Sequence, residues 1–288
     1  MYKIMTDNMA DLPKEYFDEH DIGMITLPFG IDGQMYDNVD DVDVKDFYAL
    51  MREGKETKTS QPSPGLFKEY MEEYLSQGYD GVLCLCISSG ISGTYNSALN
   101  GRELLLEEKP DANVIVVDSL CASLGEGLFV HKAVQNRDNG MSMEENAKWL
   151  EENKLNFVHA FTVDDLVYLY RGGRVKKSAA VLGTIINIKP ALHVDNEGKL
   201  INLAKVKGRR KSLNWLVDYM GDHIAGYEDK NETVFISHAD CIEDAQYVAD
   251  RIKERFGYES FMINYIGPAI GAHAGPGTVA LFFMGNER

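Results

Sequence analysis

The chain has 288 residues, which is enough for one large or two ordinary α/β domains, and we expect two. Its 29 Lys and Arg residues stand against 45 Asp and Glu, so the net charge of -16 disfavours nucleic acid and anionic membrane surfaces as partners. No apolar run reaches membrane-spanning length, so we expect a cytoplasmic protein without stable membrane insertion. The four cysteines lack metal-ligand spacing, which predicts reduced thiols and no metal site.

The chain opens with a predicted strand end at Ile4 to Asn8, and a helix is expected to start after Pro13. Asp7 lies where the strand meets the following loop, a place where α/β folds often position functional groups. The Asp7 carboxylate is therefore either a functional group or a cap for the next turn.

A compact turn that contains Thr59 and Ser60 precedes another predicted helix. Ser63 followed by Pro64 is a typical N-cap and first-turn pair, and apolar residues then repeat at helical spacing until Gly78. Because Ser63 already caps this helix, the hydroxyls of Thr59 and Ser60 are free for another partner. They form one candidate pair for a ligand site.

The strongest signal for a ligand site is a strand that leads into a hydroxyl-rich turn. Residues Val82 to Ile87 are uninterruptedly apolar, as in a parallel strand that is covered on both faces. The hydroxyl turn that follows, Ser88 to Thr94, leads into a helix whose free N–H groups and positive dipole end favour an anion. The turn therefore indicates an oxyanion-binding site; the alternative is a capped connection between strand and helix.

The remaining elements divide the chain into two parts. Before the division we expect a helix at Ala98 to Glu108, a strand at Val114 to Val117 that ends in Asp118, and a helix to about Asn153 that starts at a capping box of Ser142 and Glu145. After it we expect strands at Phe157 to Val163, Thr233 to His238, Phe261 to Ile266 and Thr278 to Met284, and a helix capped by Asp240 and Glu243 that reaches Phe256 before Gly257. The predicted domains are residues 1–155 and 156–288.

Three segments of the second part are unusual in composition. Tyr168 to Lys177 and Lys205 to Lys211 are predicted to be basic turns in an otherwise acidic protein. Gly267 to Gly277 is a glycine- and proline-rich loop with His273 at its centre. Such a loop is costly in backbone entropy, and it is typical of a segment that holds one side chain in place or lets the backbone approach a ligand. His273 is therefore a candidate site residue, the alternative being a structural histidine.

The candidate residues are compatible with more than one chemistry. Ser92, His273 and either Asp7 or Asp118 could form the triad of a serine hydrolase. The nucleophile elbow of such enzymes is Gly-x-Ser-x-Gly, however, and Thr94 stands where its second glycine belongs. Phosphate-binding, dinucleotide-binding and zinc-protease motifs do not occur in the sequence. The remaining interpretation is a binding site rich in hydrogen-bond donors. The two basic turns are also compatible with an enzyme that binds nucleotides or sugar phosphates.

Seven short motifs follow one another along the chain. They are Thr6-Asp7 with Asp11-Leu12-Pro13, Thr59-Ser60-Gln61-Pro62-Ser63, Ser88-Ser89-Gly90-Ile91-Ser92-Gly93-Thr94-Tyr95, Asp118-Ser119, Gly172-Gly173-Arg174, Gly208-Arg209 and Gly267-Pro268 through Gly277. Together they resemble the DegV family of bacterial fatty-acid-binding proteins, the lipid-presenting subunits of fatty acid kinase. The resemblance implies the EDD fold: an N-terminal α/β domain with a mainly parallel sheet, a C-terminal α/β domain with a mixed sheet, and a fatty acid between them.

The resemblance also implies which residues hold the ligand. Ser92 and the hydroxyl of either Ser60 or Thr59 would bind the carboxylate of the fatty acid. His273 and Arg209 would complete the network around it, and the acyl tail would lie in an apolar tunnel.

The function implied by the resemblance is that of a non-catalytic carrier. It would hold a long-chain fatty acid such as palmitate, stearate or oleate, without a cofactor, while an ATP-binding kinase converts the carboxylate to an acyl phosphate. Arg174 would lie on the face that meets this kinase. Two residues depart from the family pattern: Asn8 stands where Ser is usual, and Arg171 enlarges the basic turn.

Overall fold

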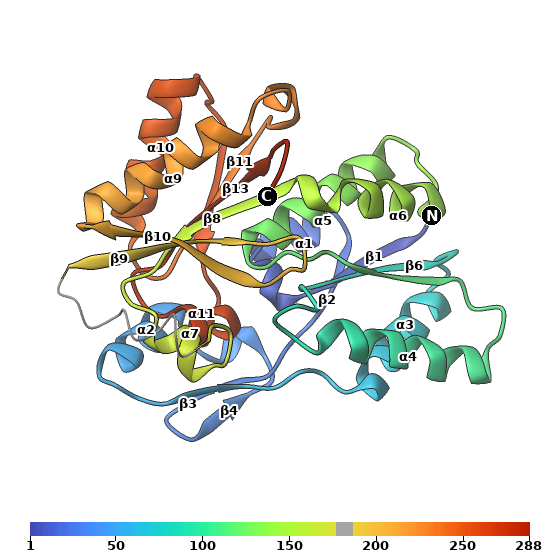
Figure 1. The fold of residues 1–288 in the computed structure, drawn as a ribbon. Coiled ribbons are helices and arrows are strands. Elements are labelled where there is room, and N and C mark those ends of the chain that lie inside the picture. Colours follow the sequence, from blue (N-terminus) through green and yellow to red (C-terminus); the bar gives the residue numbers. More distant parts are fainter. Residues whose placement is uncertain (177–186) are drawn as a thin grey trace.

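The computed structural model describes residues 1–176 and 187–288; Lys177 of the first predicted basic turn lies outside them. Two large β-sheets with helices on their faces and one small sheet make up the framework (Figure 1). The predicted α/β class, with one parallel and one mixed sheet, is confirmed. Within the described ranges, no helix is both long and apolar enough to cross a membrane.

The N-terminal sheet is parallel throughout, with strand order β2-β1-β6-β7. Its strands are β1 (Lys3–Asp7), β2 (Ile22–Ile25), β6 (Val82–Cys86) and β7 (Val114–Asp118). Helices α3 (Pro64–Ser76) and α4 (Thr94–Glu108) cover one face and α5 (Leu124–Asp138) covers the other, which is why β6 is apolar without alternation. Parallel strands end at one edge, and the hydroxyl turn leaves β6 at that edge.

The C-terminal sheet has six strands in the order β10-β9-β8-β13-β11-β12, antiparallel except for the parallel pair β11 and β12. The strands are β8 (Phe157–Thr162), β9 (Ile188–Val194), β10 (Leu200–Lys207), β11 (Val234–His238), β12 (Phe261–Tyr265) and β13 (Val279–Met284). The four predicted strands β8, β11, β12 and β13 are confirmed to within one residue at either end. Helices α9 (Arg209–His223) and α10 (Ile242–Phe256) cover the outer face.

The prediction of a basic turn at Tyr168 to Lys177 is wrong in part, because the helix α7 (Val167–Arg171) occupies its first residues. The prediction of a basic turn at Lys205 to Lys211 is wrong. Lys205 and Lys207 belong to the edge strand β10, whose side chains alternate between half-buried and exposed positions. Gly208 then turns the chain with a φ of 96°, and α9 begins at Arg209. Lysines on an exposed edge strand prevent it from pairing with other chains. Because lysines are also common in turns, the composition of this segment suggested a turn.

A small antiparallel sheet, β4-β3-β5, lies beside the two large ones. Its strands are β3 (Phe29–Ile31), β4 (Gln34–Tyr36) and β5 (Thr57–Thr59), and helices α2 (Val44–Arg52), α7 (Val167–Arg171) and α11 (Pro268–Ala274) gather near it. The prediction that Gly267 to Gly277 forms a loop is therefore wrong in part, because α11 occupies its centre. Pro268 is the first residue of this short helix, and Gly275 ends the helix with a φ of 82°.

The remaining helices begin and end largely as their caps predict. They are α1 (Lys14–Glu19), α6 (Met143–Asn153) and the 3-10 turns η1 (Asn8–Ala10), η2 (Val39–Asp41), η3 (Lys154–Asn156) and η4 (Glu228–Lys230). Ser63 caps α3, the capping box Ser142–Glu145 starts α6, and Gly257 ends α10. Asp240 does not cap α10, because its carboxylate pairs with Arg52 instead. All four cysteines are free thiols, and three of them are buried.

Helix α5 joins the two large sheets. Its residues 124–130 are all buried, since one side packs on the parallel sheet and the other on the inner face of the mixed sheet. Phe129 meets Phe157 of β8 with ring centroids 4.8 Å apart. Gly125 is needed for this approach, because a methyl group there would lie 2.1 Å from Nε2 of His159. One apolar core therefore runs from sheet to sheet.

Each large sheet is built from one part of the chain. The strands of the parallel sheet end at Asp118, and those of the mixed sheet begin at Phe157. This distribution supports the division into residues 1–155 and 156–288, which stays a prediction because α5 packs on both sheets.

Three buried carboxyl groups, Asp7, Asp11 and Glu126, lie near the start of α5. Asp7 accepts hydrogen bonds from the amides of Met9 and Ile87, at 3.0 and 3.1 Å, so the interpretation of Asp7 as a cap is confirmed. Burial raises the pKa of Asp7 and of Asp11 to about 7, and it raises the pKa of Glu126 well above its ordinary value.

These carboxyl groups make stability depend on pH. An acid whose pKa is higher in the folded chain than in the unfolded one binds its proton more tightly when folded, so the free energy of unfolding falls as pH rises from about 4 to about 7. Each such group contributes up to about 1.4 kcal/mol per pH unit. We expect Asp7→Asn to flatten the slope measured by urea unfolding at several pH values. The exposed Glu107→Gln is the control, and equal slopes in Asp7→Asn and the wild type would contradict this assignment.

Candidate functional site

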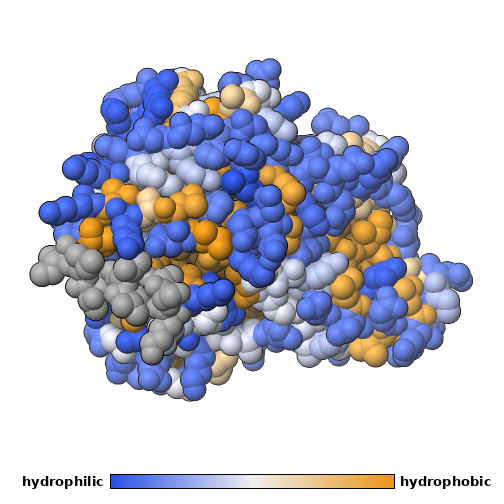
Figure 2. Space-filling model, viewed as in Figure 1, coloured by the Kyte–Doolittle hydropathy of each residue, from blue (hydrophilic) through white to orange (hydrophobic). Residues whose placement is uncertain are grey.

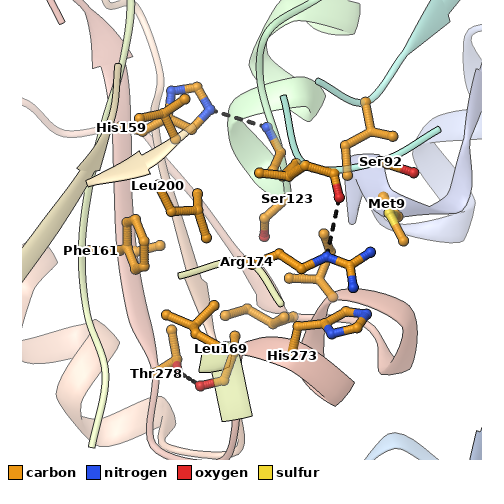
Figure 3. Close-up of a pocket in the computed structure, with 18 of the residues that line it drawn as sticks. Met9, Ser92, Ser123, His159, Phe161, Leu169, Arg174, Leu200, His273 and Thr278 are labelled. Carbon is orange, nitrogen blue, oxygen red and sulfur yellow. Dashed lines mark hydrogen bonds between the residues drawn. The ribbon is translucent and has the colours of Figure 1, made fainter. Parts of the chain in front are cut away.

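A cavity lies between the hydroxyl turn, α11 and the inner face of the mixed sheet (Figure 3). Most of its wall is apolar, with Met9, Ile91, Phe161, Leu200 and Phe282 among the side chains that face it. Its polar lining residues are Ser92, Ser123, His159, Arg174, His273 and Thr278. A largely apolar cavity with a few polar groups is typical of a site for a small, largely apolar molecule.

Three of these polar residues are turned toward the protein. Ser123 donates to the carboxylate of Asp11 at 2.5 Å, and Thr278 donates to the carbonyl of Ala274 at 3.0 Å. His159 accepts from the amide of Ala122 through Nε2, while Nδ1 lies 2.9 Å from the carbonyl of Phe157. Ser92, Arg174 and His273 remain as the groups with capacity for a ligand, and Figure 3 shows all three on the same side of the cavity.

The hydroxyl turn is held from both flanking strands. Asp7 at the end of β1 accepts from the amide of Ile87, and Asp118 at the end of β7 accepts from the amide of Ser89 at 3.1 Å. The Ser92 hydroxyl is half-buried at the cavity and lies 2.8 Å from the hydroxyl of Thr94, the first residue of α4. Two neighbouring strands thus place one hydroxyl at the start of a helix, as the sequence predicts.

His273 reaches the cavity from α11 and connects it to the small sheet. Its Nε2 lies 2.8 Å from the Thr59 hydroxyl at the end of β5. Its Nδ1 is buried, and no described atom bonds to it. Gly172 packs against this nitrogen so closely that a methyl group there would lie 2.1 Å away. Burial, together with the nearby charge of Arg174, lowers the pKa of His273 to about 4, so the imidazole is neutral at pH 7.

Arg174 supplies the positive charge of the cavity. Its Nε donates to the carbonyl of Ile91 at 3.1 Å, and a second nitrogen donates to the carbonyl of Gly172. Burial lowers the pKa of Arg174 from its ordinary value, and a guanidinium still keeps its charge at neutral pH. None of the carboxylates in the described ranges forms a salt bridge with it. An unpaired, half-buried cation therefore faces an apolar space.

Arg174 also borders a second depression, which we call the basic hollow: Arg174, Lys176, Lys199 and Lys205 over an apolar floor that includes Leu200 and Ile201. Figure 2 shows apolar surface near β9 and β10 and a second apolar area on the right of the view, with hydrophilic surface around both. Four cations so close together contrast with the net charge of -16. The basic hollow shares Ile91, Arg174 and Leu200 with the cavity, so the two are neighbours.

The structure brings only some of the predicted carboxylate ligands together. Ser92 and His273 line the cavity, and Thr59 stands behind His273. The Ser60 side chain is exposed and does not line the cavity. Arg209, in the first turn of α9, faces a different hollow, where it donates to Asp244 at 2.8 Å and to the carbonyl of Gly277 at 2.6 Å. It is committed to those partners because α9 covers the outer face of the mixed sheet.

The family resemblance implies a partner-facing position for Arg174, and it does not indicate that Arg174 also lines the cavity. The signal that could have found it is the Gly172-Gly173 pair directly before it. A glycine pair lets the backbone pass close to another group, here the imidazole of His273. The cationic side chain that follows is thereby brought to the same place.

The geometry of a serine hydrolase is not present among the described residues. The recorded hydrogen bonds of the Ser92 side chain go to Thr94, and those of the His273 ring go to Thr59. Asp7 and Asp118 accept from backbone amides rather than from an imidazole. A metal is not indicated either, since residues 1–176 and 187–288 contain no group of three His, Cys, Asp or Glu side chains placed to hold one.

Comparison with known proteins places the chain in a family. The model of the family described as "Uncharacterised protein, DegV family" matches residues 1–286. A DegV domain-containing protein of Clostridium perfringens is 44% identical over 289 residues, covering 100% of this chain and 98% of its own. Among solved structures, DegV, a fatty acid binding protein from Bacillus subtilis, is 30% identical, covers 99% of both chains and superposes with a TM-score of 0.85. A stearic acid-binding protein from Eubacterium ventriosum is 26% identical, covers 99% of this chain and 98% of its own, and gives a TM-score of 0.86. The chain therefore belongs to the DegV family.

Proposed function

We propose that this protein binds a long-chain fatty acid, with the acyl tail in the apolar cavity and the carboxylate at Ser92, His273 and Arg174. The observation that carries the proposal is the guanidinium of Arg174 in an apolar wall, where no carboxylate of residues 1–176 or 187–288 pairs with it. A half-buried cation favours an anion, and an apolar cavity favours an apolar ligand. A fatty acid satisfies both, and the relatives from Bacillus subtilis and Eubacterium ventriosum bind such ligands.

The tail and the carboxylate have different roles in this proposal. Burying about fourteen methylene groups contributes roughly 11 kcal/mol before ordering costs, at about 0.8 kcal/mol each, so the tail dominates affinity. The carboxylate costs several kcal/mol to remove from water unless it is hydrogen-bonded and its charge is compensated. Ser92 can donate a hydroxyl hydrogen bond and Arg174 the compensating charge, while Thr59 orients the neutral His273 ring. These groups therefore set the direction in which the ligand lies.

We further propose that the carboxylate is presented to a separate ATP-dependent kinase, which forms the acyl phosphate, and that this chain has no turnover of its own. Transfer of a phosphoryl group from ATP to a carboxylate oxygen gives ADP and an acyl phosphate. Arg174 supports this proposal because it borders both the cavity and the basic hollow, so a partner that docks at the hollow lies next to the carboxylate. Lys176, Lys199 and Lys205 would attract an acidic partner there.

Ligand binding can be tested on the purified protein. We expect organic extraction and mass spectrometry to recover a long-chain fatty acid, and added palmitate to raise the unfolding temperature, because a ligand that binds only the folded state stabilises it. Absence of an acyl chain together with an unchanged unfolding temperature would contradict fatty acid binding.

The charge of Arg174 can be tested against that of Arg209. Arg174→Met keeps most of the side-chain volume and removes the charge, so we expect palmitate affinity to fall by about tenfold or more, which is about 1.4 kcal/mol. Arg209→Met should leave the affinity nearly unchanged, because Arg209 faces Asp244 and not the cavity. Competition with a fluorescent fatty acid measures both. A larger loss of palmitate affinity in Arg209→Met than in Arg174→Met would instead identify Arg209 as the carboxylate ligand.

The basic hollow can be separated from ligand binding. Lys205 is exposed at the rim of the hollow, so we expect Lys205→Glu to leave palmitate affinity unchanged and to slow acyl phosphate formation by the kinase. Lys45→Glu, the same change of charge at an exposed position of α2, is the matched control. Equal rates for Lys205→Glu and Lys45→Glu would exclude the hollow as the docking place.

A further inference from the structure

The hydroxyl turn contacts the hairpin between β9 and β10 of the mixed sheet. We call residues 195–199, the end of this hairpin, the hairpin tip. The Ser88 hydroxyl donates to the carbonyl of Gly198 at 2.8 Å. Ser88 has 0% exposed surface and Gly198 is buried. The two residues are 110 positions apart, and they lie in loops that leave different sheets. This contact therefore depends on how the two sheets sit on each other.

The two backbones touch so closely that only glycine fits on either side. A methyl group on Gly90 would lie 2.5 Å from the carbonyl oxygen of Glu197. A methyl group on Gly198 would lie 2.0 Å from the Ser88 hydroxyl oxygen, and Gly198 also has a φ of 72°, which disfavours any other residue. The hairpin tip thus acts as a steric stop for the hydroxyl turn.

The position of Ser92 follows from that of Ser88. The Ser88 carbonyl accepts from the amides of Ile91 and Ser92, at 3.2 and 3.1 Å, and its hydroxyl accepts from the amide of Gly90 at 3.1 Å. Arg174 holds the same turn through the carbonyl of Ile91. The side chain of Ser88 therefore contacts the hairpin tip, while its main-chain carbonyl holds the amide of Ser92.

The hairpin tip is itself held in place by residues other than the turn. The Asp195 carboxylate accepts from the amides of Glu197 and Lys199, both at 2.9 Å. The guanidinium of Arg288 donates to the carbonyl of Asp195 at 3.2 Å and to the carbonyl of Leu120 at 2.7 Å. The tip is therefore a preformed surface against which the hydroxyl turn is placed.

We propose that Gly198 and Ser88 are positioning residues for the carboxylate site: the hairpin tip of the mixed sheet sets the place of Ser92, which the parallel sheet carries. The proposal rests on the proposed function, since it concerns the carboxylate of the bound fatty acid. It implies that a change at the hairpin tip alters recognition of the carboxylate more than burial of the tail.

The test compares palmitate with hexadecan-1-ol, which has the same chain length and no carboxylate, both delivered from cyclodextrin and measured by competition with a fluorescent fatty acid. We expect Gly198→Ala to weaken palmitate binding by about tenfold and to change binding of the alcohol much less, so the ratio of the two affinities falls. Gly226→Ala is the matched control, because Gly226 has a φ of 81° with open space around it. It shares the backbone strain and lacks the contact.

A double variant tests the steric mechanism. Ser88→Ala removes the oxygen that the Gly198→Ala methyl would meet, so we expect the double variant to return toward the ratio of Ser88→Ala alone. Three results overturn the proposal: a double variant whose affinity ratio stays at that of Gly198→Ala, an unchanged affinity ratio in Gly198→Ala, or an equal loss of affinity for palmitate and for the alcohol in Gly198→Ala. If Gly198→Ala lacks a cooperative unfolding transition, Ser88→Ala decides in the same assay: a lower ratio supports the proposal and an unchanged one overturns it. A wild-type protein that binds neither ligand instead refutes the proposed function itself.

Discussion

The burial of α5 between two sheets is the constraint on which the rest of the structure depends. Because residues 124–130 are enclosed on all sides, the carboxyl edge of the parallel sheet is held opposite the inner face of the mixed sheet. The hydroxyl turn leaves the first sheet at that edge, and the cavity lies in the space that α5 and α11 leave open. Gly125 permits the distance between the layers, since any side chain there would collide with His159.

The same arrangement decides where charge is tolerated. Near α5, burial keeps the pKa of Asp7 and Asp11 at about 7 and that of Glu126 higher, so these groups hold their protons at a pH where exposed acids have lost theirs. In the cavity, burial keeps His273 neutral, and Arg174 is left as the positive group. The net charge of -16 opposes an anion, so the local positive charge of Arg174 is needed to compensate a carboxylate in the cavity. This is the physical basis of the proposed carboxylate site.

Predictions of helix ends were correct where they depend on residues adjacent in sequence. The capping role of Ser63, the capping box at Ser142 and the stop at Gly257 depend on a few adjacent residues, and the structure confirms each of them. The same rules failed at β10, where exposed lysines conceal an edge strand, and at α11, where glycines suggested a loop. In both places packing against another element outweighs intrinsic preference.

The sequence by itself determined the α/β class, most strands of the two large sheets, the hydroxyl turn and, through its ordered motifs, membership of the DegV family. These follow from periodicity and from short-range chemistry, which the order of residues carries directly. Only the tertiary structure decided which distant residues meet. It placed Arg174 in the cavity wall, turned Arg209 toward Asp244, and set Gly198 against Ser88. Such meetings depend on the angle and distance between packed layers, which are properties of the whole core and of no single stretch of sequence.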